Sequence, residues 1–78
     1  MDGRRVHPER SGNLDLSPGD YGRTAKGVWW VCPPVGSLRV AKPETVTEHP
    51  DGTITIDGLI ANKQWKGRLV NGVWQQEG

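Results

Sequence analysis

The chain has 78 residues, a formal net charge of +1 at pH 7 and a hydrophobic content of 33%. A chain of this length forms one small domain, which buries only about 60% of the surface that its unfolded form exposes. The near-neutral charge argues against a protein that acts through bulk electrostatics on DNA or on anionic lipid.

Turn-forming residues are frequent, and long periodic segments are missing. The chain holds 11 glycines and 6 prolines, and no segment has the length and periodicity of an amphipathic helix. No stretch approaches the ~18 apolar residues that span a membrane, and no apolar run follows the first residues as in a secretory signal. The single cysteine excludes an internal disulfide framework and fits a reducing compartment. We therefore expect a soluble cytoplasmic protein made of short strands.

The chain divides into an N-terminal segment, residues 1–20, and a small β domain, residues 21–78. The N-terminal segment is mostly polar and cannot build a core of its own, so we expect it to be irregular and partly mobile. Its residues Leu14 and Leu16, together with Tyr21, have the apolar surface to pack on the sheet that follows.

Short apolar runs bounded by glycine, proline or asparagine predict the strands of the β domain. A Ser-Pro-Gly-Asp turn at residues 17–20 precedes them. The predicted strands are residues 28–32, 37–41, 45–49, 53–57, 65–70 and 73–76. We expect an all-β fold, a small antiparallel meander of about five to six strands, forming a half-open barrel or a single curled sheet.

A hairpin is predicted around the sequence His-Pro-Asp-Gly-Thr at residues 49–53. Pro50 suits the second position of a type I turn, and Gly52 suits the left-handed position that follows. This turn pairs His49 with Thr53. The resulting register places three apolar side chains on one face, which are Val46, Ile54 and Ile56, and leaves the threonines on the other.

A second hairpin is predicted at Asn71 and Gly72, since a type I′ turn requires positive φ at both central residues. Its register places Leu69 opposite Trp74 and puts the core-facing residues on one side, which are Trp65, Gly67, Leu69 and Trp74. Gly67 leaves room for the Trp74 ring to lie across the backbone.

Trp29 and Trp30 are adjacent in the first predicted strand, so their indoles point to opposite faces of the sheet. Val28, Trp30 and Cys32 form the longer apolar set, which favours Trp30 as the core residue. Trp29 and Val31 would then lie on the other face. There they are either covered by the leucines of the N-terminal segment and by Tyr21, or exposed to a partner.

No arrangement of residues indicates catalysis or metal binding. Cys32, His7 and His49 are the only soft metal ligands, whereas a structural zinc site needs four ligands, usually in close pairs. A Cys32–His49 pair lacks a third orienting group and an oxyanion hole. We therefore expect a protein that is not an enzyme, without catalytic residues, metal or cofactor, in which Cys32 is a small buried hydrophobe.

A binding surface is the remaining function, since tryptophan and arginine are enriched in interface hot spots. The candidate residues are Trp29, Val31, Arg39, Lys66 and Arg68. Interleaved basic and aromatic residues at positions 63–68 also favour a single-stranded nucleic-acid binder that stacks bases beside phosphate contacts. The predicted register opposes stacking on Trp65, because Lys66 and Arg68 point away from it. The nucleic-acid surface would then use an exposed Trp29 for stacking, with Arg39, Lys66 and Arg68 beside it.

Ordered landmarks within residues 17–75 carry a resemblance to a known family. They are Pro-Gly-Asp-Tyr-Gly at 18–22, Gly-Val-Trp-Trp at 27–30, the 46–55 hairpin, Trp-Lys-Gly-Arg-Leu at 65–69 and Asn-Gly-Val-Trp at 71–74. The chain resembles a family of small proteins encoded by bacteriophages of actinobacteria, especially mycobacteriophages. It departs from that family at residues 57–60, and it lacks cysteines that distant relatives show near Cys32.

The resemblance implies a phage or prophage product that acts in the cytoplasm of the bacterial host, and it implies no reaction. We expect a non-enzymatic accessory protein that binds a host or phage protein, without membrane contact. The alternatives are a single-stranded nucleic-acid-binding module and a small virion component. The oligomeric state stays open between a monomer and a homodimer, since an uncovered strand edge can pair with a second copy.

Overall fold

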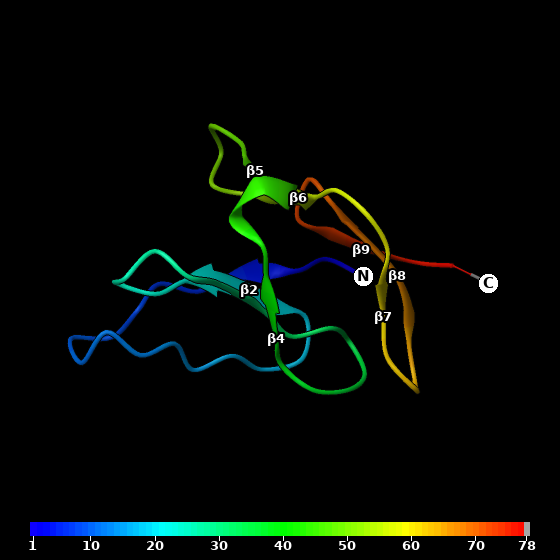
Figure 1. Ribbon diagram of the computed structural model, residues 1–78, viewed down its shortest axis with the longest axis horizontal. Helices are drawn as coiled ribbons and strands as arrows, with labels where there is room; N and C mark the ends of the chain where they lie inside the picture. The colour runs from blue at the N-terminus through cyan, green and yellow to red at the C-terminus, as the bar shows by residue number, and fades with distance from the viewer. Residues whose placement is uncertain (78) are drawn as a thin grey trace.

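The computed structural model describes residues 1–77, which form short strands, turns and one short 3-10 helix. The elements are β1 (Arg4–Arg5), β2 (Asp20–Arg23), β3 (Trp29–Val31), β4 (Arg39–Ala41), η1 (Pro43–Thr45), β5 (Val46–Glu48), β6 (Ile54–Ile56), β7 (Ile60–Ala61), β8 (Lys66–Val70) and β9 (Val73–Gln76). The predicted all-β class is confirmed. Figure 1 shows the strands in their three sheets, ordered β1-β2-β3-β4, β5-β6 and β7-β8-β9. Within residues 1–77 the sheets do not close into a barrel.

The β5–β6 hairpin has the predicted register, with Val46 opposite Ile56. The His49 N–H donates to the Thr53 carbonyl at 2.8 Å, and Gly52 has a φ of 89°. This left-handed position closes a three-residue loop in which a side chain other than hydrogen would be strained. The predicted turn is therefore confirmed.

The β8–β9 hairpin also has the predicted register, with Leu69 opposite Trp74. The turn residues have the predicted positive φ, 49° at Asn71 and 76° at Gly72. Trp65 and Trp74 are both buried and meet edge to face, with ring centroids 5.4 Å apart. This core face is confirmed.

The aromatic ring that covers Gly67 is a different one from the ring we expected. A Cβ atom at Gly67 would lie 2.5 Å from Cη2 of Trp65, so the Trp65 ring, and not Trp74, crosses the backbone there. Trp74 instead donates its indole N–H to the Gly19 carbonyl at 2.8 Å. The hydrogen bond turns the Trp74 ring toward the start of β2.

β2 and β3 form a hairpin that the sequence analysis did not predict. The Thr24 N–H donates to the Val28 carbonyl at 2.9 Å, and the Gly27 N–H donates to the Thr24 carbonyl at 2.9 Å. Gly27 has a φ of 86°, so the loop is again a three-residue turn that ends in a left-handed glycine. The register pairs Tyr21 with Val31, and β4 then pairs with the other side of β3.

The first residues of the chain pair with two sheets, whereas we expected an irregular segment. The Gly3 N–H donates to the Gly72 carbonyl at 2.7 Å, and the Trp74 N–H donates to the Met1 carbonyl at 2.8 Å. The chain then enters β1, which runs parallel to β2. Residues 1–5 thus connect the edge of β9 to the edge of β2.

The core lies between the four-stranded sheet and the apolar faces of the two hairpins β5–β6 and β8–β9. Its buried members are Tyr21, Trp29, Val31, Ala41, Ile54, Ile56, Ile60, Trp65, Leu69 and Trp74, with Val46 packed against them. We call the side of the four-stranded sheet that faces this core its inner face, and the opposite side its outer face.

The structure reverses the predicted faces of β3. Trp29 is only 6% exposed and Val31 only 1%, and both belong to the core, whereas Trp30 is half-buried on the outer face. The reason is register: Val31 pairs with Tyr21, and Trp29 pairs with Ala41, so these four residues share the inner face. The prediction that Trp30 is the core residue is wrong.

The only helix among residues 1–77 is a single 3-10 turn, which is too short to cross a membrane. It connects β4 to β5.

Candidate partner-binding surface

The outer face of the four-stranded sheet carries an apolar patch on β3 and β4 and the residues next to them. Trp30 pairs directly with Val40 of β4, so the two side chains are neighbours on this face. Val28 is 38% exposed, Leu38 is 49% exposed and Val40 is 50% exposed. We call Val28, Trp30, Leu38 and Val40 the outer patch.

Gly22 explains how the N-terminal segment reaches this side of the sheet. Gly22 pairs with Trp30, and a Cβ atom at Gly22 would collide with the Val6 carbonyl oxygen and lie 3.2 Å from Leu14 Cδ2. The missing side chain lets the segment that contains Leu14 and Leu16 cross β2 closely. The leucines therefore lie beside Trp30, and not over Trp29 as one of the predicted alternatives had it.

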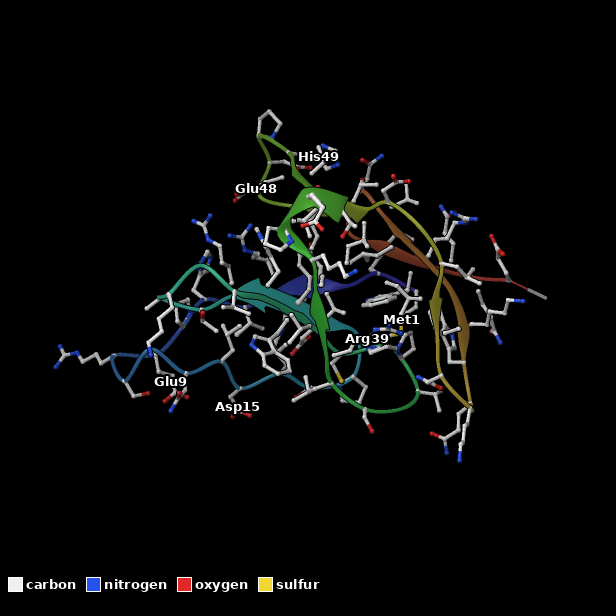
Figure 2. All side chains as sticks on the ribbon, viewed as in Figure 1. Met1, Glu9, Asp15, Arg39, Glu48 and His49 are labelled. Atoms are coloured by element: carbon white, nitrogen blue, oxygen red, sulfur yellow. The ribbon has the colours of Figure 1, made fainter. Side chains whose placement is uncertain are left out.

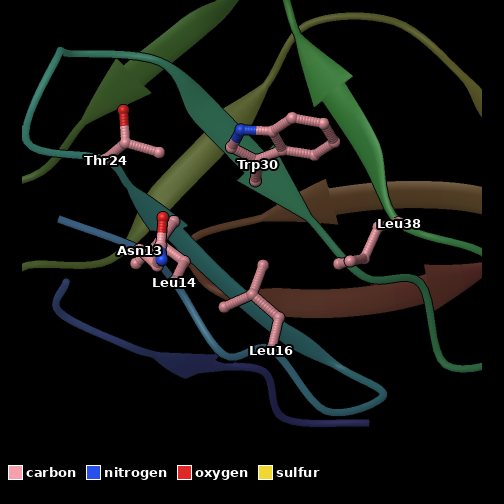
Figure 3. A pocket seen from close by; sticks show the side chains of 6 residues that line it. All are labelled: Asn13, Leu14, Leu16, Thr24, Trp30 and Leu38. Atoms are coloured by element: carbon pink, nitrogen blue, oxygen red, sulfur yellow. The ribbon is translucent and has the colours of Figure 1, made fainter. Parts of the chain in front are cut away.

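A groove of about 440 Å³ lies between this segment and the outer patch. Figure 3 shows Trp30 from β3, Leu38 ahead of β4 and the two leucines of the N-terminal segment around it. The lining residues are Asn13, Leu14, Leu16, Thr24, Trp30 and Leu38. This lining contains no charged side chain, and Asn13 and Thr24 are its two polar residues. Its chemistry suits an apolar side chain of a partner.

The five residues that we predicted as a binding surface do not form one. Trp29 and Val31 are buried in the core, so neither can contact a partner. Lys66 and Arg68 are exposed on β8, where the Arg68 Nε–H donates to Glu77 at 2.7 Å. Arg39 lies on β4, the edge strand of another sheet, and donates from Nη1 to the Ala61 carbonyl at 3.0 Å. Figure 2 shows Arg39 between β4 and β7.

The indole of Trp29 is covered by two arginines that the sequence analysis did not single out. The guanidinium carbon of Arg5 lies 4.9 Å from the ring centroid, and that of Arg23 lies 5.6 Å from it. Arg5 also donates from Nη1 to Glu48 at 2.9 Å and to the Gly52 carbonyl at 2.8 Å. Arg5 thus ties β1 to the β5–β6 hairpin across Trp29, which is a structural role.

This ion pair changes the titration of Glu48. The hydrogen bond from Arg5, followed by smaller contributions, holds the pKa of the Glu48 carboxyl below its ordinary value. The hydrogen bond favours the charged carboxylate in the folded chain. Figure 2 shows Glu48 and His49 on the β5–β6 hairpin at the top of the view.

The residues with catalytic or metal-binding chemistry are separated. Cys32 is a free thiol, buried after β3, and burial is the main cause that raises its pKa. The Nε2 atom of His49 and the Thr55 hydroxyl share a hydrogen bond of 2.7 Å. In the part of the chain that the structure describes, no three His, Cys, Asp or Glu side chains gather as a metal site would require.

Comparisons of the chain with protein-family models, with curated proteins and with solved structures gave no match. The functional interpretation therefore rests on the geometry of the outer patch and on the resemblance described above.

Proposed function

We propose that the chain is a non-enzymatic accessory protein that binds another protein through the outer patch, with Trp30 as the central contact. The observation that carries this proposal is the exposure of neighbouring apolar side chains around a half-buried tryptophan, beside an uncharged groove. Contiguous apolar patches on small domains mark interaction sites. Tryptophan is the residue type most enriched among the contacts that dominate such interfaces.

The resemblance to small phage proteins supports the second part of the proposal. The chain is a phage or prophage product that acts in the bacterial cytoplasm, and its partner is a host or phage protein. An accessory protein of this kind needs one binding surface and no active site.

Single-stranded nucleic acid is the weaker candidate. Our predicted nucleic-acid surface used Trp29 as its stacking platform, and Trp29 is only 6% exposed. The groove beside Trp30 is lined by no lysine or arginine, so base stacking and phosphate contacts are not combined there. A protein partner with an apolar side chain fits this lining better.

Affinity capture from an actinobacterial host, with the captured protein purified and its Kd remeasured, tests the proposal. Trp30→Ala and Leu38→Asp should weaken that complex by about 30-fold or more, the effect of losing a hot spot of about 2 kcal/mol. Lys66→Ala is the matched control on an exposed strand of another sheet and should change the Kd by less than about twofold. A complex that tolerates both patch substitutions and loses affinity with Lys66→Ala contradicts the proposal.

Indole N–H signals in an NMR spectrum give a second readout. The signal of Trp30 should move on binding, whereas those of the buried Trp29, Trp65 and Trp74 should stay close to their free positions. Binding to an oligonucleotide that falls steeply with salt would instead support the nucleic-acid alternative.

A further inference from the structure

We infer that the free edge of β4 binds an extended acidic peptide by strand addition, with alternating apolar and carboxylate side chains. This inference rests on the proposed function and names how the partner binds, because two of the outer-patch residues, Leu38 and Val40, lie on or next to β4. The partner would extend the four-stranded sheet and its apolar outer face by one strand.

The backbone N–H and C=O groups of Val40 point away from β3, toward the open edge of the sheet. The Thr24 N–H donates to the Val28 carbonyl, so the backbone groups of every second residue from Val28 face β2. The backbone groups of Trp29 and Val31 therefore face β4. There they hydrogen-bond to their paired residues, Ala41 and Arg39. The N–H and C=O of Val40, between those residues, face the open edge, since β4 is last in its sheet.

A second free edge lies across from β4. β7 is the last strand of the three-stranded sheet, and the Asn62 N–H donates to the Trp65 carbonyl at 2.8 Å. By alternation the backbone of Ala61 faces away from β8. The side chain of Arg39 reaches the Ala61 carbonyl, and the Asn62 amide donates to the Val35 carbonyl at 2.8 Å. Side chains, and not a backbone ladder, therefore link the two edges.

We call the space between these edges the seam. It contains two grooves, of about 480 Å³ and about 190 Å³, that both include Arg39 and Val40 in their lining. The larger groove also includes Lys63 and no carboxylate, and the smaller one includes Lys42 and a single carboxylate, Asp57. The cations outnumber the carboxylates in the seam, so an acidic segment is the complementary partner.

Alternation along β4 defines the pattern of the peptide. The side chain of Val40 lies on the outer face, and that of Arg39 points to the other side. A peptide residue beside Val40 would extend the outer patch and should be apolar. A residue beside Arg39 should carry a carboxylate, because opposite charges on neighbouring strands stabilise the pair.

A second copy of this chain is the less suitable occupant of the edge. Antiparallel pairing of two β4 strands about Val40 would bring the Arg39 and Lys42 side chains of both copies to one short interface. Like charges at that spacing oppose pairing, and short, charged edge strands are a common protection against it. The occupant that fits this edge is therefore an acidic extended segment of another protein.

Fluorescence anisotropy tests the inference with the full chain and a capped, labelled peptide of eight residues in which valine and glutamate alternate. The Val40→Pro variant lacks the outward N–H but loses no bond to β3, and it should bind this peptide about tenfold more weakly. Val40→Ala is the matched variant, since it also loses the side chain but keeps the N–H, and it should bind at least about threefold more tightly than Val40→Pro. A peptide with lysine in place of glutamate should not bind.

Equal affinity of Val40→Pro and Val40→Ala, or equal binding of the two peptides, would overturn the inference. If Val40→Pro loses its β-sheet circular dichroism, the same test uses a peptide N-methylated at the residues that face β4, which should bind about tenfold more weakly than the plain peptide. Sedimentation that shows a wild-type dimer lost in Val40→Pro would assign the edge to a second copy and also overturn it. A captured partner that depends on Trp30 but not on the N–H of Val40 would leave the proposed function standing and remove strand addition alone.

Discussion

The two faces of the four-stranded sheet differ in what covers them, although Trp29 and Trp30 are neighbours in one strand. The inner face lies under two hairpins, and its residues Tyr21, Trp29 and Val31 are buried. The outer face has cover only where Leu14 and Leu16 cross β2, and Trp30 is half-buried at the margin of that cover. Beyond this margin, on β4 and next to it, the apolar side chains are exposed to solvent.

The difference follows from the small size of the chain, which has 78 residues to cover both faces of the sheet. A domain this small can enclose one apolar face completely, and it has little chain left for a second. The apolar side chains that stay exposed on the second face form the surface for which we propose a binding role. Four tests, in order of decreasing expected effect, examine this contrast between the two faces.

Replacing each tryptophan of β3 by alanine gives the largest contrast. Trp29→Ala should lower the free energy of unfolding by about 3–5 kcal/mol, because it empties a core position. Trp30→Ala should lower it by about 1 kcal/mol, because its ring is only half-buried. Urea unfolding followed by circular dichroism measures both values. Equal losses for the two variants would remove the distinction between an inner and an outer face.

Gly22→Ala should lower the free energy of unfolding by about 1–3 kcal/mol, the range for overpacking a tight position. The added methyl group would collide with the Val6 carbonyl and press on Leu14, so the segment over β2 must shift. Acrylamide quenching of tryptophan fluorescence should increase as Trp30 loses its cover. Ala25→Gly, in the exposed β2–β3 loop, is the control and should leave the quenching of tryptophan fluorescence unchanged.

Arg5→Ala should lower the free energy of unfolding by about 2 kcal/mol. The variant loses the hydrogen bonds to the β5–β6 hairpin and the contact of the guanidinium with Trp29. Arg68→Ala is the matched control, because Arg68 and its ion-pair partner Glu77 are both exposed on the surface. We expect a change of at most about 0.5 kcal/mol for Arg68→Ala in thermal unfolding. A larger loss for Arg68→Ala than for Arg5→Ala would contradict the role of Arg5 over the inner face.

The pH dependence of Glu48 should give the smallest effect. Its pKa is lowered in the folded chain by Arg5, so its contribution to stability is complete above the unfolded value of 4.5 and is lost as pH falls through the folded value. The melting temperatures of wild type and Glu48→Gln should therefore differ at pH 7 and converge on acidification to pH 3. In an Arg5→Gln background the difference at pH 7 should shrink. Curves that run parallel over this range would exclude the ion pair as the cause.

Local turn chemistry made much of the fold predictable. Gly52 and the pair Asn71 and Gly72 fix the registers of two hairpins, and each register decides which apolar side chains face the core. The strands β1, β2 and β7 were not predicted. β1 and β7 have only two residues each, which is too short for periodicity along the chain to indicate a strand, and β1 also depends on pairing with the distant β2.

The error at Trp29 and Trp30 has a specific origin. Counting apolar residues along β3 predicted the wrong core-facing side, whereas the turn before β3 predicts the correct one. Gly27 occupies the same left-handed position as Gly52, with φ of 86° against 89°. Placing Thr24 opposite Val28 by that rule would have aligned Tyr21 with Val31 and assigned Trp29 to the core. The outer patch could thus have been found from the sequence, whereas the seam depends on two sheets meeting in space.

The pairing of residues 1–3 with residues 72–74 has a consequence for the time course of folding. These hydrogen bonds close a loop of almost the entire chain, and such non-local contacts form late and slow the folding of β-proteins. During synthesis, Met1 and Gly3 have no strand to pair with until the residues around Trp74 have left the ribosome. The core under the inner face therefore reaches its final arrangement only after translation of this region ends, and a nascent chain stopped before β9 would expose the aromatic core to other proteins.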